Sequence, residues 1–195
     1  GLRHLLYLRS GALVVVDEIA SRGLGEVTLQ LHPNGETRAA GEGIAVDSGK
    51  ARLLAAFCDV SGDARVAQPV IEPRAGRSAR APHSVRAAMG GGAERRLVTF
   101  LRFGSKDDVT ADGLRVASGP GYVEFQAGGA AWRLGSAAGL VGPGFETDAA
   151  LWVARGEGDR GKELFAVGAD DEARVSIRTP QGETTGAGFA GWAAP

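Results

Sequence analysis

Few residues of this 195-residue chain are of the types that do chemistry, and they are widely spaced. The histidines are His4, His32 and His83, too far apart for a local metal motif, so only convergence in three dimensions could join them. Cys58 is the only cysteine, which excludes an intramolecular disulfide and a cysteine-rich metal site. Its apolar neighbours predict a small buried side chain rather than a reactive thiol. The sequence therefore predicts no metal ion and no cofactor.

The acidic and hydroxyl side chains give no pattern of a catalytic site. Asp17 and Glu18 end an apolar segment, where a carboxylate commonly accepts N–H bonds from the following turn. A pair of catalytic carboxylates needs a defined separation in space, which the sequence does not supply. No serine lies in a G-x-S-x-G pattern, and the glycine run 139–144 lacks the lysine of a phosphate-binding loop. We therefore assign no catalytic residue.

Two polar regions are candidates for contact with a ligand. Residues 73–82 and the nearby Arg86 hold four arginines, whose guanidinium groups match carboxylate and sulfate oxygens. A solvated polar loop is the favoured interpretation there, and contact with an anionic polymer is the alternative. His32 shares the polar face of its segment with Thr28 and Gln30, which favours a surface histidine over one that contacts a ligand. His83 follows this loop, and we expect it to be solvated.

The balance of charge and the length of the apolar runs exclude two classes of partner. The chain has 22 basic and 23 acidic residues, whereas a duplex-binding protein usually has a basic surplus that neutralises phosphates. We expect no nucleic acid partner. No apolar run approaches the roughly 18 residues of a membrane-spanning helix, and the N-terminal residues do not resemble a signal peptide. We expect no membrane partner, and a single cysteine does not decide the compartment.

The elements that position these residues are predicted to be strands. Residues 26–32 alternate between apolar and polar side chains, with Val27, Leu29 and Leu31 on one face. Residues 3–9 and 12–18 are predicted to form a hairpin through Ser10-Gly11. Residues 13–16 are apolar on both faces, which predicts a central strand.

The same pattern continues through the chain without an amphipathic helix or a fixed repeat. About fifteen short segments read as strands, at the spacing typical of sandwiches and barrels. We predict an all-β fold, an antiparallel β-sandwich of many short strands in a single domain, 1–195. The charged stretch 105–111 is interpreted as a loop inside it, with two small domains as the alternative. Strand-like sequence begins at Leu2, so we expect the C-terminal part of a larger two-domain protein. The other predicted strands are 36–40, 44–46, 52–58, 66–72, 84–89, 95–103, 114–117, 122–126, 130–134, 151–155, 163–167 and 174–178.

The opening run RHLLYLRSGALVVVDEI, followed by TLQLHP, resembles the C-terminal β-sandwich of the heparinase II/III-like polysaccharide lyases. In that family an arginine-led strand, a turn, a VVVDE strand and a later strand ending in a His-containing stretch follow in this order. The matching residues are Arg3, Tyr7 and Leu8, then 14–18 and 29–33. Residues 98–103 (VTFLRF) also look like a late strand of that domain. The rest of the chain is similar only in its general pattern of short strands and turns.

This resemblance implies part of a two-part enzyme. In such lyases an α-helical toroid packs on the sandwich, and the cleft between them holds an acidic polysaccharide such as a glycosaminoglycan or alginate. The polymer is cleaved by β-elimination next to a uronic acid, with Tyr and His as base and acid. The toroid, which would be missing here, carries most of the catalytic residues, and nothing in this chain matches them. The resemblance leaves Arg3 and His32 as the residues that would face the cleft and bind substrate.

Three functions follow from these observations. The first is the sandwich portion of a lyase that acts on an anionic, uronate-containing polysaccharide, inactive alone and scaffolding one wall of the cleft. The others are a non-catalytic carbohydrate-binding module and a purely structural module. A binding module often presents exposed aromatic rings to sugars, and the tryptophans are the candidates, although Trp132 and Trp152 lie in strand patterns typical of a core. A sandwich without its toroid should also expose a strand edge or an apolar face.

Overall fold

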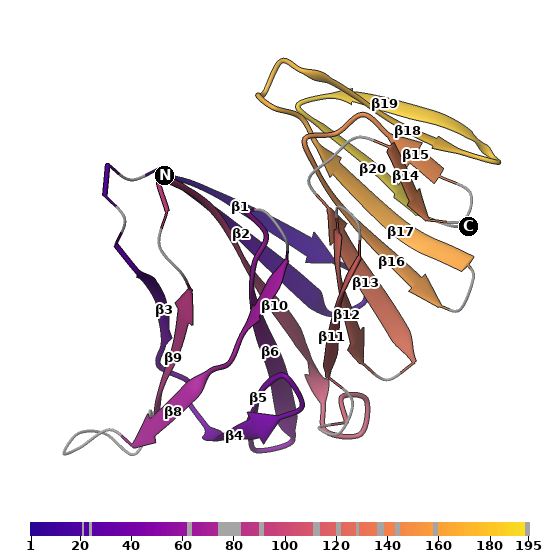
Figure 1. Cartoon of the computed structure of the whole chain (residues 1–195). Helices are drawn as coiled ribbons and strands as arrows, with labels where there is room; N and C mark the ends of the chain where they lie inside the picture. Colours follow the sequence, from indigo (N-terminus) through magenta and orange to yellow (C-terminus); the bar gives the residue numbers. More distant parts are fainter. Residues whose placement is uncertain are drawn as a thin grey trace. The chain divides into compact units, whose positions relative to one another are not determined.

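A computed structural model describes residues 1–20, 22–23, 25–61, 64–73, 83–89, 92–110, 114–119, 122–127, 129–135, 139–142, 145–157 and 160–193. Every regular element in these ranges is a β-strand, and the strands pair in antiparallel sheets. The predicted all-β antiparallel sandwich of short strands is therefore confirmed. The strands form two compact units, Gly1–Val116 and Ala117–Pro195 (Figure 1).

The first unit contains two sheets. The larger has the strand order β1-β2-β10-β6-β5-β4, with β7 also paired to β6, and the smaller has the order β3-β9-β8. The strands of the larger sheet are β1 (Leu2–Leu8), β2 (Ala12–Ala20), β4 (Glu36–Ala40), β5 (Gly43–Ser48), β6 (Ala51–Asp59), β7 (Arg65–Ala67) and β10 (Glu94–Ser105). Those of the smaller sheet are β3 (Val27–Leu31), β8 (Val70–Pro73) and β9 (His83–Met89).

Alternating apolar side chains join these two sheets into a sandwich. One face of strands β5, β6 and β10 packs against the small sheet, to which β9 contributes its apolar face. Because successive side chains of a strand point to opposite faces, the two-residue repeat supplies this core from both sheets. The buried residues of the cluster are Ile44, Val46, Ala55, Phe57, Val85, Ala87, Met89 and Leu97.

The predicted opening hairpin is present, with Tyr7 opposite Leu13 in its register. Gly11 has a φ of 78°, a left-handed conformation that favours glycine. The guanidinium of Arg102 donates to the carbonyls of Ser10 and Gly11 at 2.6 and 2.9 Å and so fixes the turn against β10. Strand β2 lies between β1 and β10, as its two apolar faces predict, and β1 is the edge of the sheet.

The second unit is also built from two antiparallel sheets around its own core. One has the order β11-β12-β13-β16-β17-β20 and the other the order β14-β15-β18-β19. Their strands are β11 (Arg115–Gly119), β12 (Tyr122–Ala127), β13 (Ala130–Gly135), β14 (Gly139–Gly142), β15 (Phe145–Thr147), β16 (Leu151–Glu157), β17 (Arg160–Val167), β18 (Arg174–Thr179), β19 (Gly182–Ala187) and β20 (Phe189–Ala193). The buried residues between the sheets are Phe145, Ala149, Trp152, Ala154, Leu164, Ala166, Val175, Ile177 and Ala190.

The structure differs from the sequence prediction at several elements. Residues 66–72 do not form one strand but two, β7 and β8, which belong to different sheets. Pro69 lies between them, and a proline cannot donate the ladder hydrogen bond that a continuous strand would need. Strands β14, β15, β19 and β20 were not predicted. The arginine-rich residues 74–82 lie outside the described residues, as does part of the stretch 105–111.

Candidate functional site

Arg3 lies on the edge strand β1, directly opposite Asp17 of β2. Its Nε donates to Oδ1 of Asp17 at 2.5 Å and its Nη2 to Oδ2 at 3.0 Å, a two-point ion pair. The Arg3 side chain is 62 % exposed, whereas that of Asp17 is 11 % exposed. Asp17 therefore holds the guanidinium of Arg3 rather than the turn N–H groups that the sequence suggested. Because the charges of the pair cancel, Arg3 offers oriented donors more than net charge.

Two further side chains follow Arg3 on the same face of β1. Leu5 and Tyr7 are 65 % and 59 % exposed, and Tyr7 is stacked with Phe103 of β10. The two ring centroids are 6.2 Å apart and the ring planes differ by 21°. We call the surface made by Arg3, Leu5, Tyr7 and Phe103 the open aromatic face.

This face is the uncovered continuation of the inner face of the large sheet. Leu13 lies opposite both Tyr7 and Leu101, and Leu101 lies opposite Ala55, which belongs to the core under the small sheet. Side chains that are opposite one another across antiparallel strands share a face. The small sheet thus covers β5, β6 and part of β10 but leaves this face of β1 exposed, so the unit has the kind of open apolar edge that the sequence led us to expect.

His32 is exposed and follows the end of β3, and the structure does not bring it to Arg3. Val27 pairs with Met89, at the end of β9 that leads into β10, and Leu31 pairs with Val85 at the other end. His32 is therefore roughly 17 Å further along the strand than Val27, at about 3.3 Å per residue. Figure 1 shows the connection from β3 to β4 at the end of the unit remote from the N-terminus. The two residues expected to bind substrate therefore lie at different ends of the unit, and their contact with a polymer stays a prediction.

His4 lies on the opposite face of β1 from Arg3, as the alternation predicts. Its Nε2 is 4.0 Å from Oε1 of Glu18, beyond hydrogen-bond distance. The same oxygen accepts from Nε of Arg96 at 3.0 Å and lies 2.7 Å from its Nη2. A neighbouring pair joins Asp59 to Nη1 of Arg95 at 2.6 Å. The sequence gave no sign of these groups, because their partners are distant in the chain and meet only through the order of the strands.

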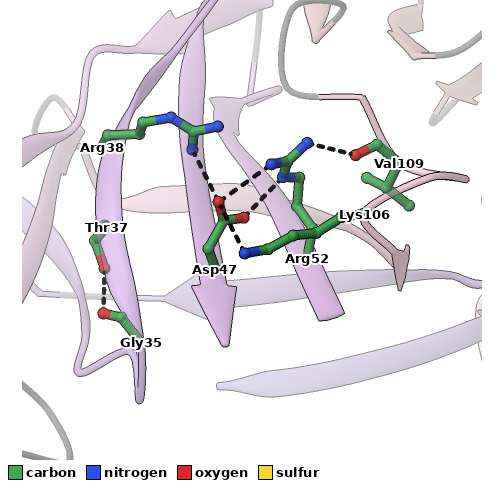
Figure 2. A network of polar contacts seen from close by, with 7 residues as sticks. All are labelled: Gly35, Thr37, Arg38, Asp47, Arg52, Lys106 and Val109. Atoms are coloured by element: carbon green, nitrogen blue, oxygen red, sulfur yellow. Dashed lines mark hydrogen bonds and ion pairs between the residues drawn. The ribbon is translucent and has the colours of Figure 1, made fainter. Parts of the chain in front are cut away.

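A third polar group surrounds Asp47 near the turn between β5 and β6 (Figure 2). Nε and Nη2 of Arg52 donate to Oδ1 and Oδ2 of Asp47 at 2.7 and 3.1 Å, and Nη1 donates to the carbonyl of Val109 at 3.0 Å. Arg38 and Lys106 approach the same Oδ2 at 3.8 and 3.6 Å. The hydrogen bonds from Arg52 lower the pKa of Asp47 despite its burial, and the charges of Lys106 and Arg38 act in the same direction.

The tryptophans do not form a sugar-binding platform. Trp132 and Trp152 are buried, as their strand patterns suggest. Trp192 is partly buried and its ring is tilted by 56° against that of Phe145, with centroids 6.1 Å apart. Cys58 is also buried, and desolvation raises the pKa of its thiol to about 12. The exposed aromatic side chains are instead phenylalanines and a tyrosine, at positions that sequence alone had not distinguished from core.

Further searches of the structure and of known proteins add no assignment. In the described part of the chain, no three His, Cys, Asp or Glu side chains are grouped so that they could hold a metal ion. Within the same ranges no helix has the length and apolar character needed to cross a membrane. No protein-family model matches the chain, and no curated protein or solved structure is significantly similar to it.

Proposed function

We propose that this chain is the β-sandwich portion of a heparinase II/III-like polysaccharide lyase and that its open aromatic face forms one wall of the substrate cleft. The observation that carries the proposal is the row of Arg3, Leu5 and Tyr7 on an edge strand, beside Phe103. These residues fall within the segments that resemble the lyase family. The expected substrate is an anionic polysaccharide that contains uronic acid.

The chemistry of the open aromatic face suits such a polymer. Aromatic rings present apolar area on which the C–H face of a sugar ring can pack. The planar guanidinium of Arg3 can donate to a carboxylate, and Asp17 holds it in place. Arg3 and Tyr7 are four residues apart, about 13 Å along the strand, so a bound chain would lie along β1.

The first test is binding of acidic polysaccharides to the 195-residue chain and to its variants. We expect Tyr7→Ala and Phe103→Ala each to weaken binding of alginate or heparin by about two- to tenfold, because each removes a stacking surface. Phe189→Ala is the matched control, since Phe189 is also exposed and stacked, on Phe165, but lies in the second unit. Unchanged binding in the Tyr7 variant, or an equal loss in the Phe189 variant, would contradict the proposal.

The second test concerns catalysis. The described residues include no set that we assign to β-elimination, so we expect this chain alone to release no unsaturated uronate from any of these polymers. Steady release of that product would overturn the assignment of catalysis to a part outside this chain.

A non-catalytic carbohydrate-binding module is the second candidate, because the stacked Tyr7 and Phe103 would serve such a module equally well. The two candidates differ in whether the polymer must carry a carboxylate that accepts hydrogen bonds from Arg3. In a lyase wall, Arg3→Ala should weaken binding of acidic polymers and leave binding of a neutral glucan unchanged. Equal binding of neutral and acidic polymers would favour the module, and no binding of either would leave a structural role.

A further inference from the structure

We propose that Arg38 and Lys106, placed around the Arg52–Asp47 pair, form a binding site for a single sulfate, phosphate or carboxylate group. This site is separate from the open aromatic face, and the inference does not depend on the proposed function. It rests on the number, spacing and exposure of the cations that surround one carboxylate.

The four contacting side chains carry an excess of positive charge. Arg38, Arg52 and Lys106 contribute three positive charges and Asp47 one negative charge, which leaves +2 for these four side chains, an excess that Glu36, opposite Asp47 in the register, reduces but does not cancel. The lowered pKa of Asp47 means that its carboxylate is already ionised at neutral pH, so the excess persists there. Two like charges held near one point repel each other, and a bound anion relieves that repulsion.

The three cations do not share Asp47 equally. Arg52 holds both oxygens at hydrogen-bond distance and is anchored to Val109, and its side chain is only 14 % exposed. Arg38 and Lys106 lie beyond hydrogen-bond distance from Oδ2, and their side chains are 43 % and 38 % exposed. Arg52 and Asp47 thus form a fixed ion pair. The N–H donors of Arg38 and Lys106 make no hydrogen bond to Asp47 and can donate to a bound anion.

The topology brings these cations together from separate segments. Arg38 comes from β4, Arg52 from β6 and Lys106 from the turn that follows β10. Figure 2 shows Arg38 and Lys106 reaching the carboxylate from different sides. The turn that carries Lys106 also holds Asp108, whose carboxylate accepts a hydrogen bond from Ser105 Oγ at 2.5 Å. The exposed donors of Arg38 and Lys106 therefore lie on different sides of the carboxylate, where an anion could contact them.

The test is to titrate small anions into the full chain at low ionic strength and to measure their binding by NMR or calorimetry. The probes are inorganic sulfate, inorganic phosphate and free glucuronate, none of which is long enough to require the open aromatic face. We expect at least one probe to bind and added sodium chloride to weaken it, since exposed charges are screened. Arg38→Ala and Lys106→Ala should each weaken binding by about threefold or more. Preference for glucuronate would identify a sugar acid, and preference for the inorganic ions a free anion.

Variants that change charge without removing a donor separate a binding role from a structural one. Asp47→Asn removes the competing carboxylate and should strengthen anion binding, although it weakens the pair with Arg52. Glu36→Gln should act in the same direction and keeps the fold intact, because Glu36 is exposed and lies opposite Asp47 in the register. Arg178→Ala is the control, an exposed arginine paired with a single carboxylate, Glu183. Failure of all three probes to bind, an equal loss in the Arg178 variant, or weaker binding by Glu36→Gln would overturn the proposal.

Discussion

Three carboxylates in the described part of the chain have a pKa below the usual range, because each receives directed hydrogen bonds. Asp148 accepts from the backbone N–H of Ser176 at 2.7 Å and from its Oγ at 2.9 Å, and the backbone bond is the main cause of the lowered pKa. Burial alone would raise the pKa of Glu124, but hydrogen bonds from Arg133 and Gln126 outweigh it. The charged forms of these residues are therefore part of the folded structure.

The pH dependence of stability follows from the direction of these shifts. A carboxyl group whose pKa is lower in the folded than in the unfolded state stabilises the fold above the unfolded pKa, about 3.9 for Asp. That stability is lost as the pH falls through the folded pKa. We expect the free energy of unfolding, measured with urea at a series of pH values, to be nearly level above about pH 5 and to fall on further acidification.

Asp148→Asn should flatten this acid decline, and Ser176→Ala, which removes one of the two donors, should flatten it less. An acid decline as steep in Asp148→Asn as in the wild type would show that this carboxylate does not contribute to it.

For single residues, the sequence predicted the strand face on which a side chain lies better than the residue that it contacts. The two-residue repeat placed Arg3 and His4 on opposite faces of one strand, and the structure agrees. It could not predict that Arg96 meets Glu18, 78 residues away, because that contact depends on β10 pairing with β2. For the same reason the sequence grouped Arg3 with His32, which the structure separates, and did not find Phe103 beside Tyr7.

Among the elements, the turn between β1 and β2 depends most clearly on a single residue. Gly11 has the positive φ, and a Cβ at this position would lie 2.5 Å from Nη1 of Arg102 and 2.9 Å from the carbonyl oxygen of Phe103. The guanidinium of Arg102 occupies this space because it holds the carbonyls of the turn. The hairpin that presents the open aromatic face is therefore fixed from the side of β10.

Gly11→Ala should lower the free energy of unfolding by about 1–2 kcal/mol through the left-handed backbone alone, and by more through the clash with Arg102. Gly49→Ala is the matched control, since Gly49 has a φ of 58° and no atom within 4 Å of an added Cβ. Urea denaturation should show the larger loss for Gly11. Equal losses in the two variants would mean that the contact with Arg102 is not a constraint.

Sequence patterns found several strands that bury one face but missed β19, which is held by its neighbour. The alternation in 27–31 and the apolar run in 12–18 each predicted a strand that is present. Strand β19 reads GETTGA, which is polar, rich in glycine and exposed or half-buried throughout. It is a strand because it pairs with β18 along its whole length, and no local signal records that pairing.

At the scale of the molecule, each compact unit has a core between two sheets of its own. Phe57 lies in the core of the first unit and Ile177 in that of the second, and both are fully buried. The division falls between Val116 and Ala117, after the charged stretch that the sequence marked as a loop. The expectation of a single domain across 1–195 stays a prediction, and it can be tested through these two residues.

Phe57→Ala should lower the free energy of unfolding by about 3–5 kcal/mol and Ile177→Ala by about 2–5 kcal/mol, because each leaves a cavity in a packed core. Leu5→Ala, at an exposed position, should change it by no more than about 0.5 kcal/mol. Native-state hydrogen exchange then shows whether each core variant loosens its own unit or both. Loss of protection throughout the chain from either variant would support one cooperative domain.

The fold class followed from the sequence because alternation and turn residues recur in nearly every segment. The function did not follow in the same way, since the residues that suggest it are an exposed row on one edge strand and a cluster of cations from three segments. Both surfaces exist only after β10 has entered the sheet between β2 and β6. A single sequence records which side chains face outward but not which of them become neighbours.

The buried position of Cys58 allows the reactivity of its thiol to report opening of the structure around β6. The only thiol in the chain lies on β6, between β10 and β7 in the register, and has no exposed surface. A thiol reagent can reach it only when the packing over that face of β6 opens, and its high pKa slows the reaction further by keeping the reactive thiolate scarce. The rate of modification in native buffer would therefore report how often that packing opens, without any introduced cysteine.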